Sequence, residues 1–277
     1  MASDRTPGPL DISFQSGQGG ITTGGGFGLP GPVGLQSRLP APVATKELNI
    51  VGGDFDWDPP ITDADEINKL NSNLWSPGTK DFVAVVNSSP GNPTASTAND
   101  FGAFLGAIVM SAKGSITRIN LITHANKDLI AFGGKLISTA TLIRDVQLNV
   151  NPPGSNLVSL DVQSIKALAQ PGVSFQLPNN QKQFFIADIR DKFASGATIV
   201  LYACHSGLLT TFIQDIAKFF QTKVVGFTTE IAFCPPPQTN PAKFIRTGMQ
   251  LGIGSCASKV SDFRTLINNS LAVTATP

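Results

Sequence analysis

One uncharged apolar run constrains the fold more than any other feature of the sequence. The run covers residues 197–203, follows Gly196 and contains no charged side chain. A strand of this composition is typical of the middle of a parallel sheet, where helices bury both of its faces. The run ends directly on Cys204, and reactive groups gather at the carboxyl ends of such strands. The sequence therefore predicts an α/β fold with a cysteine at the carboxyl edge of its sheet.

Strands and helices alternate on both sides of this run. We expect further strands at residues 82–86, 116–123 and 223–227. Apolar residues at helical spacing predict a helix capped by Asn99 or Asp100 and a long helix after Gly207. Weaker patterns predict a hairpin around Gly133 and Gly134, a strand within 142–150, helices near 160–168, 185–193 and 263–271, and a frayed end over the last six residues. Such alternation indicates a three-layer α/β/α sandwich with a mostly parallel sheet.

The amino-terminal part differs in composition from this core. Residues 1–50 are rich in Gly and Pro, so we expect a flexible arm that cannot bury enough apolar surface to become ordered. Residues 51–80 are expected to form an acidic linker with a short helix opened by Asp63 and Glu66. The linker resembles a calcium loop in the spacing of its first carboxylates, but Pro59 stands where that loop needs glycine. The main domain is then expected to span residues 81–277.

Charge and cysteine content exclude several classes of function. The formal net charge is +1, which gives no electrostatic reason to expect binding to nucleic acid or to a membrane surface. Three cysteines, Cys204, Cys234 and Cys256, have no metal-ligand spacing, so neither a disulfide framework nor a zinc site is expected. No cofactor is expected either. Because no signal-peptide pattern or apolar run of about 18 residues occurs, we expect a cytoplasmic protein.

Cys204 has one candidate catalytic partner, His124, which ends the strand expected at residues 116–123. A thiolate is a nucleophile, and an adjacent imidazole can take its proton and later give one to a leaving amine. His205 is set aside because consecutive side chains of a strand point to opposite faces. The amides that open the next helix would face the sulfur and stabilise negative charge there. A buried cysteine alone is more often a small hydrophobic residue, but the joint placement of Cys204 and His124 favours catalysis.

The residues around both positions resemble a known family. The stretch Tyr202-Ala203-Cys204-His205-Ser206-Gly207 is similar to the cysteine motif of caspase-like (clan CD) peptidases, closest to metacaspases and CHAT-domain proteases. Leu121-Ile122-Thr123-His124 is similar to the histidine strand of the same family, and the resemblance covers about residues 81–229. It implies a caspase-hemoglobinase fold and a His124–Cys204 dyad that cleaves peptide bonds. It also implies an oxyanion hole made by the backbone amides of Cys204 and Ala125.

The sequence departs from this family at the specificity pocket. Metacaspases carry an acidic residue two positions before the cysteine, and Tyr202 stands there, so a preference for basic substrates is not inherited. Asn87, Ser88 and Glu230 are further candidates for pocket walls, beside the interpretation that they are ordinary loop residues. Residues 141–180 are expected to form an insertion beside the site, because the segment between histidine and cysteine is longer than in compact members.

Three functions remain open from the sequence. The first is a cysteine endopeptidase acting on a protein or peptide substrate. The second, from another class, is a non-catalytic caspase-like interaction module with a vestigial site. The third is a peptidase that stays inactive until self-cleavage or an activating protein partner releases it.

Overall fold

The fold is built on one central sheet. The computed structural model describes residues 44–53, 77–133, 157, 159–177, 180–234, 246–252 and 256–277. Six strands form the sheet in the order β13-β10-β9-β3-β1-β2. Their bounds are β1 (Lys46–Gly52), β2 (Ala95–Ala98), β3 (Ile116–Ile122), β9 (Phe193–Tyr202), β10 (Lys223–Phe227) and β13 (Ala272–Ala275). All neighbours are parallel except β10 and β13, which confirms the predicted α/β fold with a mostly parallel sheet.

The apolar run that the sequence singled out is the centre of this sheet. It forms the carboxyl half of β9, between β3 and β10. Ile199 and Leu201 pack into the core on one face, and Val200 and Tyr202 pack into the core on the other. Each of these side chains is at most 2% exposed, so the prediction of a strand buried on both faces is confirmed.

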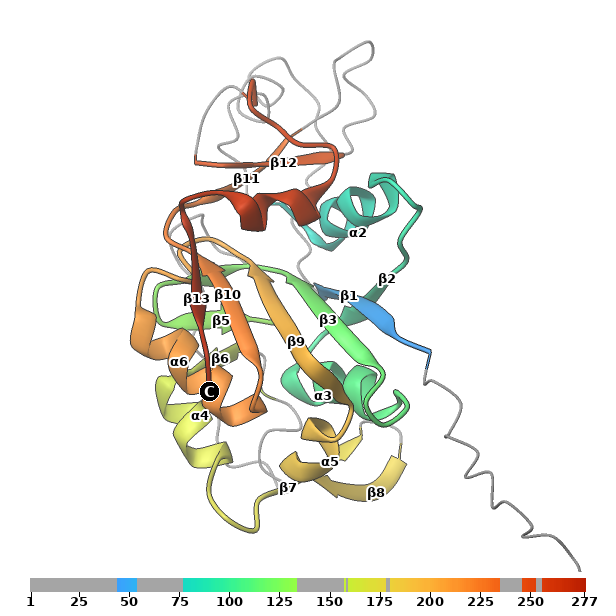
Figure 1. The fold of residues 1–277 in the computed structure, drawn as a ribbon. Coiled ribbons are helices and arrows are strands. Elements are labelled where there is room, and N and C mark those ends of the chain that lie inside the picture. Colours follow the sequence, from blue (N-terminus) through green and yellow to red (C-terminus); the bar gives the residue numbers. More distant parts are fainter. Residues whose placement is uncertain are drawn as a thin grey trace, which may run out of the picture. The chain divides into compact units, whose positions relative to one another are not determined.

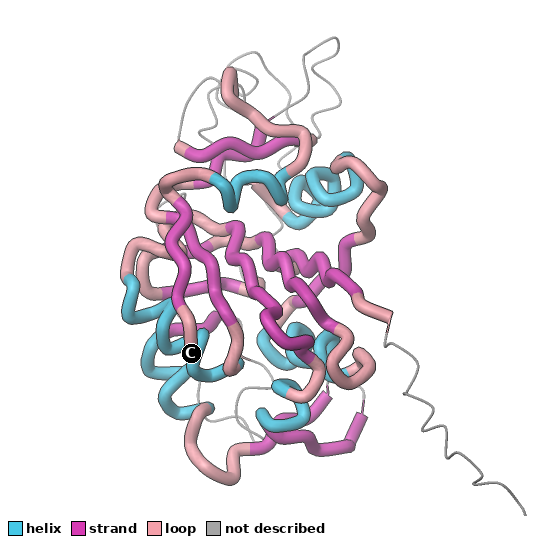
Figure 2. Tube along the Cα trace, viewed as in Figure 1, coloured by secondary structure: helices cyan, strands magenta, loops and turns pink. Residues whose placement is uncertain are grey.

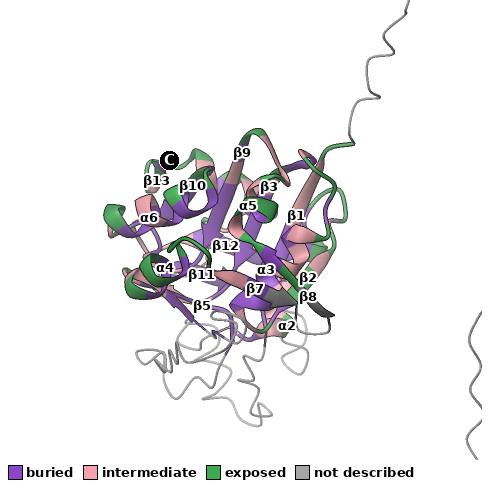
Figure 3. Ribbon diagram, turned by 90° about the horizontal axis from the view of Figure 1, so that it is seen from below, coloured by how far each residue is buried: buried purple, intermediate pink, exposed green. Residues whose placement is uncertain are grey.

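Helices cover both faces of the sheet (Figure 1). One face packs against α3 (Phe101–Val109) and α6 (Thr210–Phe220), with α4 (Val162–Leu168) and α5 (Ile186–Arg190) in the same layer. The other face packs against α2 (Thr79–Ser88) and the 3₁₀ helix η1 (Phe263–Asn268). The tube in Figure 2 shows these helices above and below the strands. Seen from below, the central strands are coloured mostly as buried, and exposed residues lie on the outer helices (Figure 3).

The order of the strands creates a switch point. From β1 the chain passes through α2 to β2 at one edge, and α3 then returns it past β1 to β3. The direction of winding therefore changes between β1 and β3. In open α/β sheets, sites form beside the carboxyl ends of the strands at such a point.

Two sequence predictions about the amino-terminal part of the core are wrong. Residues 82–86 form part of α2 rather than a strand, because Phe82, Val85 and Val86 are spaced to place one helical face on the sheet. The carboxylate of Asp81 accepts a hydrogen bond from the Gly78 amide and so caps this helix. The first strand is instead β1, in a segment that the sequence assigned to the arm and the linker.

Other elements are partly as predicted. Asp100 caps α3 through a hydrogen bond from the Ala103 amide, which confirms the expected cap. A hairpin directly after His124 joins β4 (Ala125–Asn126) to β5 (Leu129–Ala131), whereas the second arm of the hairpin predicted at Gly133 and Gly134 lies outside the described residues. The last residues include β13 and are not frayed. Predictions for residues 1–43, 54–76 and 134–156 lie outside the described residues.

Three smaller sheets accompany the central sheet in the part of the chain that the structure describes. β6 (Ser159–Asp161) pairs with β5, and β7 (Ser174–Leu177) pairs with β8 (Asn180–Phe185). β11 (Ile231–Cys234) and β12 (Gly248–Leu251) form an antiparallel pair after β10. None of the helices in the described ranges is both long enough and apolar enough to cross a bilayer.

The cysteines correct another expectation. Cys234, the last residue of β11, forms a disulfide with Cys256, whereas no disulfide was expected from the cysteine spacing. The pair is separated by 22 residues and is brought together by the β11–β12 hairpin, which sequence spacing does not reveal. Cys204 is the free cysteine.

Candidate active site

The register of the sheet brings the two candidate catalytic residues to the same edge of the sheet, at the ends of neighbouring strands. Ile122 of β3 pairs with Tyr202 of β9, and His124 and Cys204 each follow two positions later. Both residues stand just beyond the ends of their strands, and their contacts place them on the face that carries Ile122 and Tyr202, beside α2. The Phe82 ring of α2 lies 5.3 Å from the His124 ring, and Cys204 packs against the same apolar cluster.

His124 is held in one orientation by the backbone. Its Nε2 lies 2.8 Å from the carbonyl oxygen of Pro77, just before α2. A carbonyl can only accept, so Nε2 carries the proton and the neutral ring keeps its lone pair on Nδ1. Burial lowers the pKa of His124 to about 4 against the opposing effect of the Pro77 hydrogen bond, and the charge of Arg246 lowers it further. The imidazole is therefore neutral at pH 7 and can accept a proton on Nδ1.

The Cys204 thiol is bound to a different part of the chain. Its Sγ donates to the carbonyl oxygen of Ile231 at 3.7 Å and accepts from the Ile231 amide at 3.3 Å. Across the described ranges, both hydrogen bonds of the thiol therefore go to the first residue of β11 and neither goes to His124. Burial raises the pKa of Cys204, and the Glu230 charge adds to this effect. The sulfur is thus a neutral thiol in this arrangement, not a thiolate.

The turn after Cys204 packs directly against β10. The Ser206 hydroxyl donates to the carbonyl oxygen of Leu201 and accepts from the Phe227 amide. A Cβ atom at Gly207 would lie only 2.7 Å from the carbonyl carbon of Gly226, so only glycine fits here. The helix that follows, α6, begins at Thr210, later than the sequence suggested. The amides that open α6 therefore do not directly follow Cys204 in the chain.

His205 points toward Glu230. Its Nε2 lies 3.2 Å from Oε1 of Glu230, and its Nδ1 lies 3.4 Å from the carbonyl oxygen of Thr228. Hydrogen bonds from its own backbone and from the Thr229 hydroxyl, together with the His205 contact, hold the pKa of Glu230 below its usual range. Glu230, a candidate pocket wall, therefore lies near Cys204 and is paired with a histidine.

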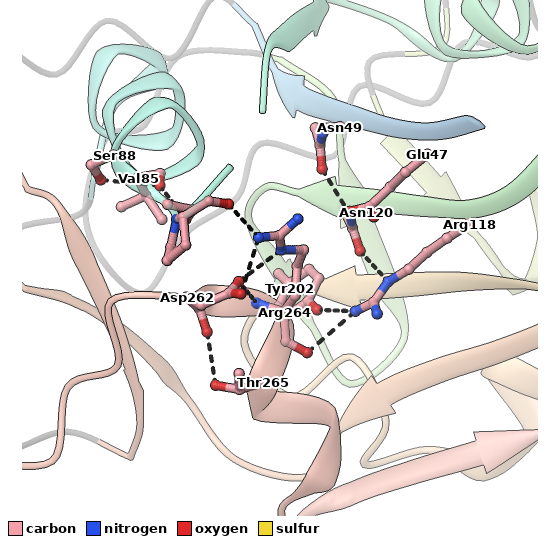
Figure 4. Close-up of polar contacts among 12 residues, drawn as sticks. Glu47, Asn49, Val85, Ser88, Arg118, Asn120, Tyr202, Asp262, Arg264 and Thr265 are labelled. Atoms are coloured by element: carbon pink, nitrogen blue, oxygen red, sulfur yellow. Dashed lines mark hydrogen bonds and ion pairs between the residues drawn. The ribbon is translucent and has the colours of Figure 1, made fainter. Parts of the chain in front are cut away.

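Tyr202 lies inside the protein rather than at its surface. Its side chain is 0% exposed, and its hydroxyl accepts a 2.6 Å hydrogen bond from Nη2 of Arg118. Figure 4 shows the network that continues from Arg118 to Asn120 and on to Asn49. Asn120 also donates to Glu47. Tyr202 therefore joins β9 to a polar network on the sheet face beside η1.

The remaining candidate residues lie on α2 and β4. Asn87 and Ser88 are in the last turn of α2, where the Ser88 hydroxyl bonds to the carbonyl oxygens of Val85 and Thr247. Ala125 begins β4 directly after His124 and pairs with Ile130.

Sequence reasoning missed several residues that shape the site. Pro77 and Ile231 act through backbone atoms, which leave no signal in the sequence. Arg246 is only 3% exposed and lies 3.9 Å from the carboxylate of Asp81, the residue next to Phe82 on α2. A lone arginine among ordinary residues gave no indication that it would be buried near His124.

Comparisons with known proteins add no relative. No family model matches the chain, and searches of curated proteins and of solved structures also found no match. The functional assignment therefore depends on the geometry of the site.

Proposed function

We propose that the protein is a cysteine endopeptidase of the caspase-like type, with Cys204 as nucleophile and His124 as general base and acid. The observation that carries the proposal is the register of β3 and β9, which brings both residues to one face of the carboxyl edge of the sheet. The caspase-hemoglobinase fold and the oxyanion hole at Ala125 and Cys204 are parts of the same proposal. The mostly parallel sheet and the switch point beside β3 support it.

The reaction follows from the orientation of the imidazole. Nδ1 of His124 takes the thiol proton, and the sulfur attacks the carbonyl carbon of the scissile peptide bond. The carbonyl oxygen becomes negative and is stabilised by the backbone amides of Cys204 and Ala125. His124 then returns the proton to the leaving amine, and a thioester remains. Water, deprotonated by the same nitrogen, hydrolyses the thioester and restores the thiol.

The Pro77 carbonyl supports this cycle in two ways. It fixes the ring so that Nδ1 is the nitrogen with a lone pair, and it accepts a hydrogen bond from the ring while His124 is positively charged. Pro77 therefore takes the place that an acidic residue occupies in a catalytic triad.

A second function is favoured by one observation. The thiol is neutral and bonded to Ile231, as expected for a vestigial site in a non-catalytic interaction module.

The Cys234–Cys256 disulfide weighs against the cytoplasmic location suggested by the sequence, since disulfides persist mainly in oxidising compartments. The peptidase proposal does not depend on the compartment.

Hydrolysis of a peptide library by wild type and by Cys204→Ala separates the two functions. We expect Cys204→Ala to lose at least about a thousandfold in rate, because the nucleophile is removed. The Lys113→Ala variant, which breaks a remote surface ion pair with Asp191, should hydrolyse peptides like wild type. Equal hydrolysis by wild type and Cys204→Ala would refute the proposal. Self-cleavage is followed by mass spectrometry of aged wild type beside Cys204→Ala.

A further inference from the structure

The segment Thr228–Ile231, here called the connector, links β10 to β11 and binds the turn after Cys204. The amide of His205 donates to the Thr229 carbonyl oxygen at 2.9 Å. The His205 ring adds the contacts to Thr228 and Glu230 described above. At the far end of the connector, the Ile231 backbone forms both hydrogen bonds of the Cys204 thiol. Residues 204 and 205 are therefore bound to every residue of the connector.

This arrangement directs the thiol proton away from the dyad. The proton on Sγ is donated to the Ile231 carbonyl oxygen, whereas peptide cleavage requires its transfer to Nδ1 of His124. The contact between Sγ and the Ile231 backbone must therefore break before the sulfur can react. The connector therefore competes with His124 for the same proton.

We propose that the connector is an intramolecular latch that holds Cys204 unreactive until it separates from the sulfur. The inference rests on the proposed peptidase function and assigns a regulatory element to the same site. The His205–Glu230 pair is the part that can open, because its side chains are 33% and 39% exposed and such exposed polar pairs are weak. The other side of the connector is fixed, since the Glu230 carbonyl oxygen accepts a hydrogen bond from the Gly252 amide at the end of β12.

The backbone at His205 fits this role. Its φ of 54° is in the left-handed region, which few non-glycine residues adopt, although Asn, Asp and His do so more often than others. The contacts to Thr228, Thr229 and Glu230 hold the residue there. Replacement by asparagine keeps that conformation accessible and removes the ring that reaches Glu230, so His205→Asn isolates the latch from the fold of the turn.

The test measures the rate of iodoacetamide labelling at Cys204 by mass spectrometry at neutral pH. We expect His205→Asn to raise the rate about twofold to fivefold, as loss of one exposed side-chain pair allows. His205→Asn leaves the Glu230 charge in place, and that charge raises the pKa of the Cys204 thiol. Faster labelling of this variant therefore reports separation of the connector from the sulfur and not an easier deprotonation of the thiol. Glu230→Gln is a second variant that weakens the same pair. Lys113→Ala, which breaks an ion pair of 78% and 58% exposed side chains elsewhere, should label like wild type.

A second measurement reports directly on the connector. The Ile231 amide donates to Sγ, so its hydrogen exchange should accelerate in the same variants. Unchanged labelling and unchanged exchange in both variants would overturn the latch, even if the protein cleaves peptides through Cys204. Faster labelling without peptide cleavage by any variant would support the latch and refute the peptidase. The two failures are therefore distinguishable.

Discussion

The close approach of Gly207 to Gly226 gives the sharpest prediction about the turn that carries Cys204. A Cβ atom at position 207 would lie 2.7 Å from the carbonyl carbon of Gly226, 2.8 Å from the Phe227 nitrogen and 2.9 Å from the Gly226 oxygen. All three are backbone atoms of β10 and cannot rotate away. Gly207→Ala must therefore move the turn away from the strand.

Two physical effects make up the cost of this substitution. Overpacking of this kind costs about 1–3 kcal/mol. Movement of the turn also weakens the 2.8 Å hydrogen bond from the Gly207 amide to the Phe227 carbonyl oxygen, worth about 1 kcal/mol. The sum is about 3 kcal/mol, and for a domain of this size each kcal/mol lowers Tm by about 2–4 °C. We expect Gly207→Ala to melt about 6–12 °C below wild type.

Thermal unfolding followed by circular dichroism tests this value, with Gly196→Ala as the matched control. Gly196 has a φ of 77°, and a Cβ atom there would meet nothing within 4 Å. Alanine at position 196 therefore destabilises the protein only through its left-handed backbone conformation, by about 1 kcal/mol. Gly207→Ala should lower Tm clearly more than Gly196→Ala does. A Tm for Gly207→Ala equal to that of Gly196→Ala would refute the argument from close packing.

Two further predictions concern polar side chains, partly buried His124 and fully buried Tyr202. The pKa of His124 is about 4 in the folded protein and near 6.5 when unfolded, so as pH falls from 6.5 to 4 the unfolded state binds a proton that the folded state does not. The free energy of unfolding, measured with urea, should therefore fall by up to about 3 kcal/mol over this pH range. His124→Gln should remove that part of the pH dependence. Equal pH dependence in wild type and His124→Gln would contradict the burial of the ring. Tyr202→Phe removes the acceptor of the Arg118 hydrogen bond and should cost about 1–2 kcal/mol in the same assay. A change in substrate preference with no loss of stability would contradict this structural role of Tyr202.

The central strands could be predicted because their signals are local. The run ending at Cys204 has no charge, and Asp100 precedes a clear helical pattern, so β9 and α3 follow from neighbouring residues alone. The five apolar residues at 82–86 were ambiguous, since a short apolar run fits a buried strand or a helix face equally well. Only the packing of α2 against the sheet distinguishes the two.

The strand β1 was missed for a physical reason. Glu47 and Asn49 interrupt its apolar character, so the segment resembles a polar extension of the arm. In the structure both side chains accept hydrogen bonds from Asn120 on the neighbouring strand. Buried polar side chains are tolerated on a sheet when they form hydrogen bonds with one another. Here those hydrogen bonds join residues about seventy positions apart in the sequence. No local pattern contains this information.

The same limit explains why the sequence found the two candidate catalytic residues but not the state of the site. Neighbouring strand ends place His124 and Cys204 at the same edge of the sheet, and both side chains could be named from sequence. Their charge states depend on what surrounds them: burial raises the pKa of the thiol and lowers that of the imidazole, so both changes favour the neutral pair. Proton transfer from Sγ to Nδ1 is therefore unfavourable in this arrangement. It becomes easier only if the Ile231 contact opens and a substrate or water solvates the charges that form.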